Sequence, residues 1–238
     1  MKKLILLFAV AFNLNSNEFL TGSLVDYSGL IKMPNARFNN EGKVSFNYSR
    51  YDPYGKYVFQ FSPYDWFEGA LFYTDINSLG YPDFERGPGG MQSQKDKGFS
   101  LKARLFKEGE CYGLDYAFCE YLPNVAVGLV DFAGTSLTAS EYVVASKSFG
   151  RFDLTAGLGW GALGSTDNIG GNPLSILTDK FDQRGSGYSL GLMGGVPGVS
   201  TWFRGTTSVF GGVEYVIPKA RFYPVNSKIK LEYDSIDH

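Results

Sequence analysis

Cations and carboxylates are the groups of this sequence that could do chemistry, and most of them stand in stretches where polar and apolar residues alternate. The candidates are Lys102, Arg104, Lys147, Asp131, Glu141, Asp153 and Glu214. Two carboxylates at a suitable separation can cleave a glycosidic bond, one as acid and the other as base or nucleophile. Because cations of similar placement are available to pair with these carboxylates, we expect structural ion pairs and do not predict an enzyme.

Histidine and cysteine chemistry is limited by the small number of these residues. The one histidine is His238, so no internal imidazole is available as the base of a Ser–His–Asp or Cys–His site. Cys111 and Cys119 are the two cysteines, and their spacing suits no zinc site. In an exported protein they are candidates for a disulfide, with two free thiols as the alternative. We predict no metal ion and no cofactor.

The composition is that of an all-β protein. Aromatic residues make up 16% of the chain, glycine occurs 30 times, and no stretch has the pattern of a long amphipathic helix. Alternation recurs along the chain, for example at 44–48, 57–61 and 99–105. The net charge of −2 gives no reason to expect binding to nucleic acid.

The stretch GRFDLTAGLGWGALG (150–164) shows which kind of all-β fold to expect. Phe152 and Leu154 alternate with Asp153 and Thr155, so one face of the strand is apolar and the other is charged or small. A soluble sandwich would turn the apolar face inward, whereas a membrane barrel turns it toward lipid. Charges of both signs on the polar face favour the barrel, as do aromatic residues such as Trp160 near strand ends. We predict an antiparallel transmembrane β-barrel of roughly 10–12 strands, either complete or part of a larger assembly.

The N-terminus has the layout of a secretory signal peptide. Lys2 and Lys3 precede an apolar run from Leu4 to Leu14, which is too short to cross a bilayer as a helix. We therefore divide the chain into a signal peptide (1–17), an N-terminal segment (18–42) and a β-barrel domain (43–238). The N-terminal segment contains GLIKMPNAR and is expected either as an edge strand or as filling of the barrel interior.

Four ordered stretches resemble the YjbH family: GLIKMPNARFNNEG (29–42), DKGFSLKARLFKE (96–108), the block at 122–161, and WFRGTTSVFGGVEY (202–215). Members of this family are outer-membrane barrel proteins encoded with exopolysaccharide or capsule machinery in Gram-negative bacteria. The resemblance supplies no catalytic motif. Family members are usually much longer, which puts export of polymer by this chain alone in doubt.

The resemblance implies an outer-membrane protein that supports production or export of an exopolysaccharide or capsular polysaccharide. Its implied partners are outer-membrane lipid, the extracellular polysaccharide, and small periplasmic or outer-membrane secretion proteins. A porin-like channel for small solutes and a non-conducting scaffold are the alternatives. The residues expected to line the interior or touch polymer are Lys102, Arg104, Asp131, Glu141, Lys147, Asp153, Trp202, Arg204 and Glu214.

Overall fold

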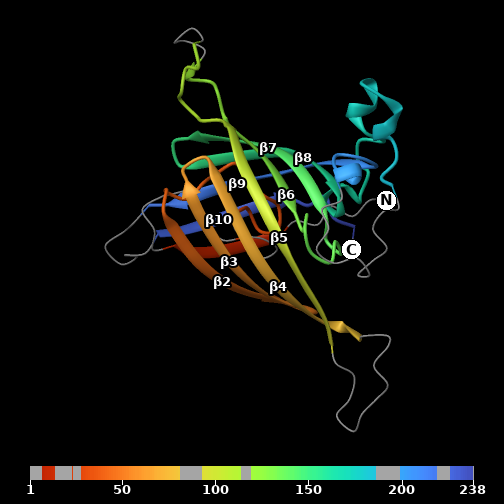
Figure 1. Cartoon of the computed structure of the whole chain (residues 1–238). Coiled ribbons are helices and arrows are strands. Elements are labelled where there is room, and N and C mark those ends of the chain that lie inside the picture. The colour runs from red at the N-terminus through yellow and green to blue at the C-terminus, as the bar shows by residue number, and fades with distance from the viewer. Residues whose placement is uncertain are drawn as a thin grey trace.

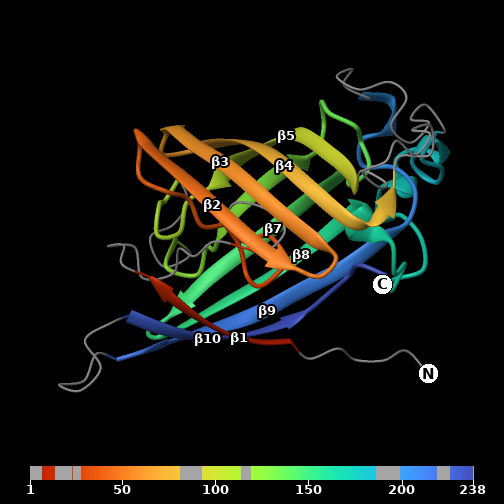
Figure 2. The same cartoon turned by 90° about the horizontal axis from the view of Figure 1, so that it is seen from below.

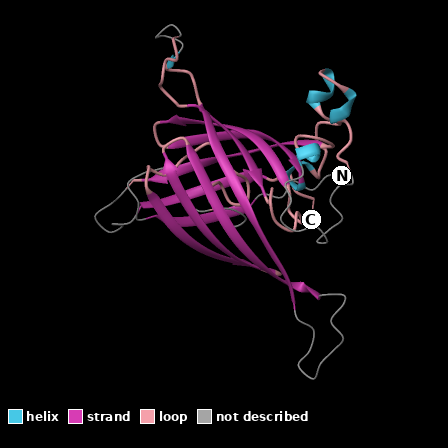
Figure 3. Ribbon diagram, viewed as in Figure 1, coloured by secondary structure: helices cyan, strands magenta, loops and turns pink. Residues whose placement is uncertain are grey.

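Ten β-strands make up most of the computed structural model (Figures 1 and 3), which describes residues 7–13, 23, 28–80, 93–113, 119–185, 199–218 and 226–237. The strands are β1 (Leu7–Asn13), β2 (Lys43–Tyr51), β3 (Tyr54–Tyr64), β4 (Phe67–Gly80), β5 (Ser93–Phe106), β6 (Asn124–Val130), β7 (Ser140–Phe149), β8 (Phe152–Gly161), β9 (Thr207–Ile217) and β10 (Asn226–Tyr233).

All ten strands belong to one antiparallel sheet in the order β1-β10-β9-β8-β7-β6-β5-β4-β3-β2. The sheet curves strongly, so that β2–β4 lie across an interior from β8–β10 and β1 (Figure 2). Among the described residues the edge strands β1 and β2 do not pair, so the sheet is not closed. The all-β antiparallel architecture is as predicted, and the transmembrane barrel, complete or part of a larger assembly, stays a prediction.

Residues Leu7–Asn13 pair with β10, from Leu7 opposite Glu232 to Asn13 opposite Asn226. They lie within the stretch interpreted from the sequence as a signal peptide, and residues 1–6 and 14–17 of that stretch lie outside the described residues. Removal of residues 1–17 during export stays a prediction.

The two faces of the sheet differ in polarity in the inverted sense that the sequence predicted. On β2, Val44, Phe46 and Tyr48 are half or more exposed on the outer face, while their neighbours Ser45 and Asn47 are more covered. The concave face carries buried charges on several strands, namely Lys56, Glu68, Lys102, Asp153, Glu214, Lys228, Lys230 and Glu232. Successive side chains of a strand point to opposite faces, so the separation of apolar from charged residues continues along each strand.

The interior of the curved sheet is filled by part of the N-terminal segment. We call residues 28–39 the inner segment; ten of its twelve residues are buried. Its apolar side chains Leu30, Met33, Ala36 and Phe38 form the main core with residues of β6, β7 and β9, such as Ala126, Tyr142, Val144 and Phe210. Of the two expected arrangements for GLIKMPNAR, the described residues adopt the interior filling.

Four short 3₁₀ turns have described bounds: η1 (Ala162–Gly164), η2 (Pro173–Ile176), η3 (Asp179–Phe181) and η4 (Val199–Thr201). No helix in the described part of the chain combines the length and apolarity needed to span a membrane.

The loop that follows β8 covers one of the aromatic residues predicted at the membrane boundary. Trp160 is only 2% exposed, and its indole N–H donates to Asn172 Oδ1 at 3.1 Å. The ring of Phe203 meets it edge-on at 5.2 Å. Trp160 therefore lies at the end of β8, as predicted, but beneath a loop that supplies both a cover and a hydrogen-bond acceptor.

Candidate functional site

The inner segment enters the interior, turns and leaves toward β2, which begins directly after it at Lys43. An antiparallel bridge joins Gly29 to Pro34, and the amide of Leu30 donates to the carbonyl of Met33 at 2.8 Å. We call residues 30–33 the tip and residues 36–39 the return limb. The interior of the sheet with this segment is the candidate functional site, because the buried charges converge on it.

The tip is held through its main chain by charged side chains of β10. The Glu232 carboxylate accepts the amides of Ile31, Lys32 and Met33 at 2.8–3.0 Å. Lys230 Nζ donates to the carbonyls of Gly29 and Leu30 at 2.8 and 2.7 Å. Successive amides that converge on one carboxylate form a concave anion site of the kind found in tight turns. The charges of β10 thus satisfy backbone groups that burial would otherwise leave without partners.

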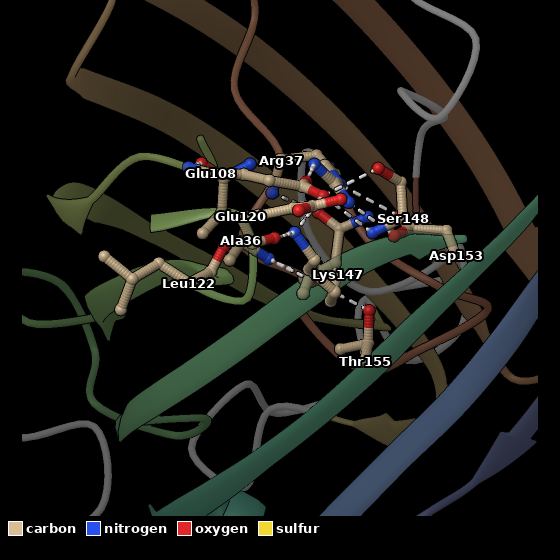
Figure 4. A network of polar contacts seen from close by, with 12 residues as sticks. Ala36, Arg37, Glu108, Glu120, Leu122, Lys147, Ser148, Asp153 and Thr155 are labelled. Carbon is tan, nitrogen blue, oxygen red and sulfur yellow. Dashed lines mark hydrogen bonds and ion pairs between the residues drawn. The ribbon is translucent and has the colours of Figure 1, made fainter. Parts of the chain in front are cut away.

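The Arg37 side chain attaches the return limb to β8 and to Glu108 (Figure 4). Its guanidinium donates two bonds to Asp153 on β8, at 2.9 and 2.5 Å, and a third to Glu108 at 2.7 Å. The planar guanidinium suits such bidentate contact with a carboxylate. Asp153 is fully buried, so Arg37 is the cation that compensates its charge in the described structure.

Glu108 extends this network from the return limb to β7. Its second oxygen accepts the amide and hydroxyl of Ser148, at 3.1 and 2.7 Å, and lies 3.2 Å from Lys147 Nζ (Figure 4). Burial works to raise the pKa of Glu108, but the hydrogen bonds from Ser148 and Arg37 and the Arg37 charge outweigh it and lower that pKa. The carboxyl therefore stays ionised at the junction between the return limb and the sheet.

A second buried ion pair, on β4 and β5, contacts both the start of the inner segment at Ser28 and its return limb. Lys102 Nζ on β5 lies 2.8 Å from Glu68 Oε2 on β4, and both side chains are fully buried. Lys102 also donates to the Ser28 hydroxyl and the Arg37 carbonyl at 2.7 and 2.6 Å. Glu68 accepts the amide of Asn39 at 2.6 Å. The Lys102–Glu68 pair therefore binds the inner segment at both of its ends, near residue 28 and near residues 37–39.

A cavity lies at each end of the inner segment. One of about 460 Å³ is lined by the return limb and by the ends of β5 and β6, including Arg37, Asn40, Arg104 and Glu108. The other, of about 640 Å³, lies by the tip and the opposite strand ends, including Lys32, Tyr51, Tyr54 and Leu163. The inner segment stands between these two cavities.

Four of the residues predicted to line the interior face it. Lys102 and Asp153 hold the inner segment as described above. Glu214 lies 3.4 Å from Lys230 and is fully buried. Arg104 lines the smaller cavity, stacks its guanidinium over the Phe38 ring at 4.5 Å, and lies 3.6 Å from Asp65. These contacts are ion pairs and a cation–π contact within the protein.

Glu141 and Lys147 correct the expected lining of the interior. Their strand partners are Trp160 and Leu154, on the face opposite Tyr142 and Val144 of the core. Arg184 covers Glu141 with two bonds of 2.6 and 2.8 Å, and the Phe203 amide adds a third of 3.0 Å. Lys147 reaches past the strand end to the carbonyls of Glu120 and Leu122. Residues beyond the strand ends contact both charges, and Lys147 also lies 3.2 Å from Glu108, the partner of Arg37.

Asp131 directly follows β6 and is fully buried. It accepts the amide of Thr138 at 3.2 Å, and its Oδ1 lies against Gly98 and Gly134, where an added Cβ would meet it at 2.2 and 2.4 Å. Burial, and next the charge of Asp96, raise the pKa of Asp131 to about 7. The two glycines make room for a carboxyl that the loop buries without a cation at hydrogen-bond distance among the described residues.

The remaining predicted residues lie in loops. Trp202 and Arg204 are half-buried on either side of Phe203, in the loop that covers Glu141 and Trp160. Trp202 and Arg204 therefore lie in a loop at one end of the sheet and not on a strand. Cys111 and Cys119 are joined in a disulfide within the loop between β5 and β6.

Sequence analysis missed Glu68 and Glu108 as members of the site. Glu68 has the same parity as the buried residues Ala70 and Phe72 of β4, so alternation within WFEGALFY was a usable signal. Glu108 lies beyond the end of β5, where alternation no longer applies. Nothing in the local sequence indicates that it contacts Arg37, 71 positions away.

Comparison with known proteins places these observations in a family. The family model YjbH, described as "Exopolysaccharide biosynthesis protein YbjH", matches residues 23–238. The chain is also similar to the "Uncharacterized lipoprotein YjbH" of Escherichia coli (strain K12), with 41% identity over 206 residues. That alignment covers 87% of this chain and 27% of the relative, so the chain spans about a quarter of the relative's length. No solved structure matches.

Proposed function

Since the chain belongs to the YjbH family of exopolysaccharide biosynthesis proteins, we propose that it is an exported outer-membrane protein that supports polysaccharide production or export without catalysis of its own. The observation that carries the membrane part of this proposal is the inverted polarity of the sheet. Exposed Phe, Leu and Tyr side chains on the outer face suit acyl chains, while the charges are sequestered on the concave face. The relative's name as a lipoprotein agrees with an exported, membrane-associated protein.

The ion pairs of the interior also support the proposal. A charge placed on the lipid face at mid-depth costs about 2–4 kcal/mol, so a sheet in a membrane should keep its charges inside. Lys102, Asp153 and Glu214 are fully buried on the concave face and each has an oppositely charged side chain within 3.4 Å. The partners that this function requires are outer-membrane lipid, the polysaccharide itself, and secretion proteins of the periplasm or outer membrane.

The test of this function is deletion of the gene in the source bacterium, followed by complementation. We expect less cell-surface polymer in the deletion strain, recovery with the wild-type gene, and recovery of the protein from the outer-membrane fraction. Normal polymer in the deletion strain would remove the polysaccharide role, and a soluble monomer that needs no detergent would remove the membrane role.

The buried inner segment favours a non-conducting scaffold as the second candidate over a porin-like channel. Its residues occupy the interior between the two cavities, and its polar main-chain groups are tied to Glu232, Lys230 and Glu68. We expect little single-channel conductance from the purified protein in planar bilayers. Replacement of residues 28–39 by a Gly/Ser linker should increase the conductance, whereas a large conductance in the wild-type protein would favour the channel.

A further inference from the structure

The larger cavity has the residue content of a carbohydrate site, and this inference rests on the proposed function. We propose that the cavity beside Tyr51 and Tyr54 binds neutral pyranose rings of the polysaccharide. Its volume of about 640 Å³ falls within the range of small-ligand sites, which is about 300–1,000 Å³.

Two tyrosines provide an aromatic wall for this cavity. Tyr51 ends β2 and Tyr54 begins β3, and they are paired across the turn with ring centroids 5.1 Å apart. Tyr51 has the parity of the more covered residues of β2, and Tyr54 has that of the buried Lys56 and Val58 on β3. The negative π-face of an aromatic ring attracts the partly positive C–H groups on one face of a pyranose. A second tyrosine pair, Tyr48 and Tyr57, lies on the outer face with centroids 4.7 Å apart.

Two of the residues that line the same cavity have buried polar atoms without hydrogen-bond partners. Asp96 is 1% exposed, and its Oδ2 has no hydrogen-bond partner among the described residues. The same holds for the hydroxyl of Thr138, while the Thr138 amide is used by Asp131. A buried polar atom without a partner costs about 1–3 kcal/mol. The hydroxyl groups of a sugar would supply a donor to Asp96 and either a donor or an acceptor to Thr138.

The charge around the cavity selects a neutral ligand over an acidic one. Carboxylates on its wall are Asp52, Asp96 and Asp237, and the cations are Lys32 and Lys56. Lys32 is already paired with Asp234 at 3.2 Å. A uronic acid would therefore bring negative charge next to an excess of carboxylates, which is unfavourable at these short separations.

Lys32 of the tip and Pro34, which directly follows the tip, form part of the same wall. A sugar in the cavity would thus touch the segment that fills the interior, together with the ends of β2 and β3. This location puts the polymer at one rim of the sheet and requires no open passage through it.

Isothermal titration calorimetry of the full-length protein tests this site. The protein should be kept in a detergent without a sugar headgroup, since maltosides would compete. The probes are maltotetraose and cellotetraose, with tetragalacturonate as the acidic comparison. We expect a neutral probe to bind with a Kd of about 1 mM or tighter, and the acidic probe to bind at least about tenfold more weakly.

The tyrosine pairs supply matched variants for this experiment. Tyr51→Ala with Tyr54→Ala should weaken binding at least about tenfold, whereas Tyr48→Ala with Tyr57→Ala on the outer face should leave it unchanged. Thr138→Val conserves shape, removes the free hydroxyl and should weaken binding about threefold to tenfold, which keeps the test available if the double tyrosine variant does not fold.

Either of two binding results with the neutral probes would overturn the carbohydrate site: absence of binding to both, or equal binding by wild type, the Tyr51/Tyr54 variant and Thr138→Val. A preference for tetragalacturonate would equally overturn it. None of these results touches the polymer phenotype of the deletion strain, so the site can fail while the proposed function stands. If the deletion strain keeps normal polymer, the proposed function fails whatever the calorimetry shows.

Discussion

The tip and the return limb of the inner segment lie within the same curved sheet but are attached to it by different groups. At the tip, Glu232 and Lys230 bind main-chain amides and carbonyls, so the contact is nearly independent of the tip's own side chains. On the return limb, one side chain, Arg37, joins Asp153 and Glu108. A charged side chain in the interior can therefore bind either the main chain of a turn or one oppositely charged side chain. The two attachments should respond differently to substitution and to pH.

Loss of the arginine should have the largest effect. Arg37→Met leaves the buried Asp153 carboxylate without its cation, and removal of one partner from a buried pair costs about 3–5 kcal/mol. Urea unfolding in detergent micelles measures this loss. Arg151→Met, an exposed arginine in the turn before β8, is the matched control and should change stability by less than about 0.5 kcal/mol.

The double variant Arg37→Met with Asp153→Asn sharpens the first prediction. Because it removes both charges, it should regain part of the stability that Arg37→Met loses. Equal losses in the single and double variants would mean that the ion pair does not attach the return limb.

Glu232→Ala should come next, with a loss of about 2 kcal/mol, because three buried amides lose their acceptor. Glu232→Gln retains a side-chain oxygen and should lose less. The exposed Glu41 supplies the control variant Glu41→Ala. If Glu232→Ala and Glu41→Ala unfold at the same urea concentration, the turn at 30–33 does not depend on this carboxylate.

Glu108, which binds the return limb, and Asp131 should make contributions to the free energy of unfolding that change with pH in opposite directions. The pKa of Glu108 is lowered in the folded protein, so its contribution is present above the unfolded-state pKa and is lost as the pH falls below it. The pKa of Asp131 is raised to about 7, so its contribution is present at low pH and is lost as the pH rises toward 7.

Unfolding in urea between pH 2.5 and pH 8 measures both contributions, because that of Glu108 is lost below its unfolded-state pKa and that of Asp131 as the pH rises toward 7. Asp131→Asn should remove the loss of stability on the alkaline side, and Glu108→Gln should reduce the loss on the acidic side. A pH profile that neither substitution alters would contradict the placement of these two carboxyls.

The smallest effect is expected at a side chain of the tip itself. Lys32 Nζ lies 3.2 Å from Asp234, and after Lys32→Ala the Asp234 carboxylate still accepts the Ile236 amide. Lys32→Ala should therefore cost much less than Glu232→Ala, since the Lys32 amide keeps its contact with Glu232. A loss as large as that of Glu232→Ala would remove the contrast between a tip held by its main chain and a return limb held by a side chain.

The sequence allowed the polarity of the sheet to be predicted where alternation is unambiguous. Phe152 and Leu154 stand on the exposed face of β8, and Asp153 is buried, as the pattern in FDLT indicates. In EYVVASKSF both faces carry apolar residues, so the sequence does not tell which face Glu141 and Lys147 share. Their charges lie at strand ends, where loop residues such as Arg184 can neutralise them on either face.

Contacts of the inner segment were beyond the reach of local patterns. Glu232 accepts amides about 200 positions earlier in the chain, and main-chain donors leave no trace in residue type. Trp160 illustrates the same limit, because its cover comes from Asn172 and Phe203 of a loop whose path the sequence does not specify. By contrast, the sequence did place GLIKMPNAR, which carries Lys32 and Arg37, among the candidates for filling the interior.

The central claim is that the apolar outer face contacts lipid while the charged face is enclosed. Nitroxide labels at Phe59→Cys and at its neighbour Gln60→Cys test it in reconstituted membranes, since Phe59 is 43% exposed and Gln60 is 6% exposed. We predict that the label at 59 collides frequently with dissolved oxygen and rarely with a water-soluble nickel complex, and that the label at 60 does not favour oxygen in this way. Ready access of the nickel complex to the label at 59 would contradict the account.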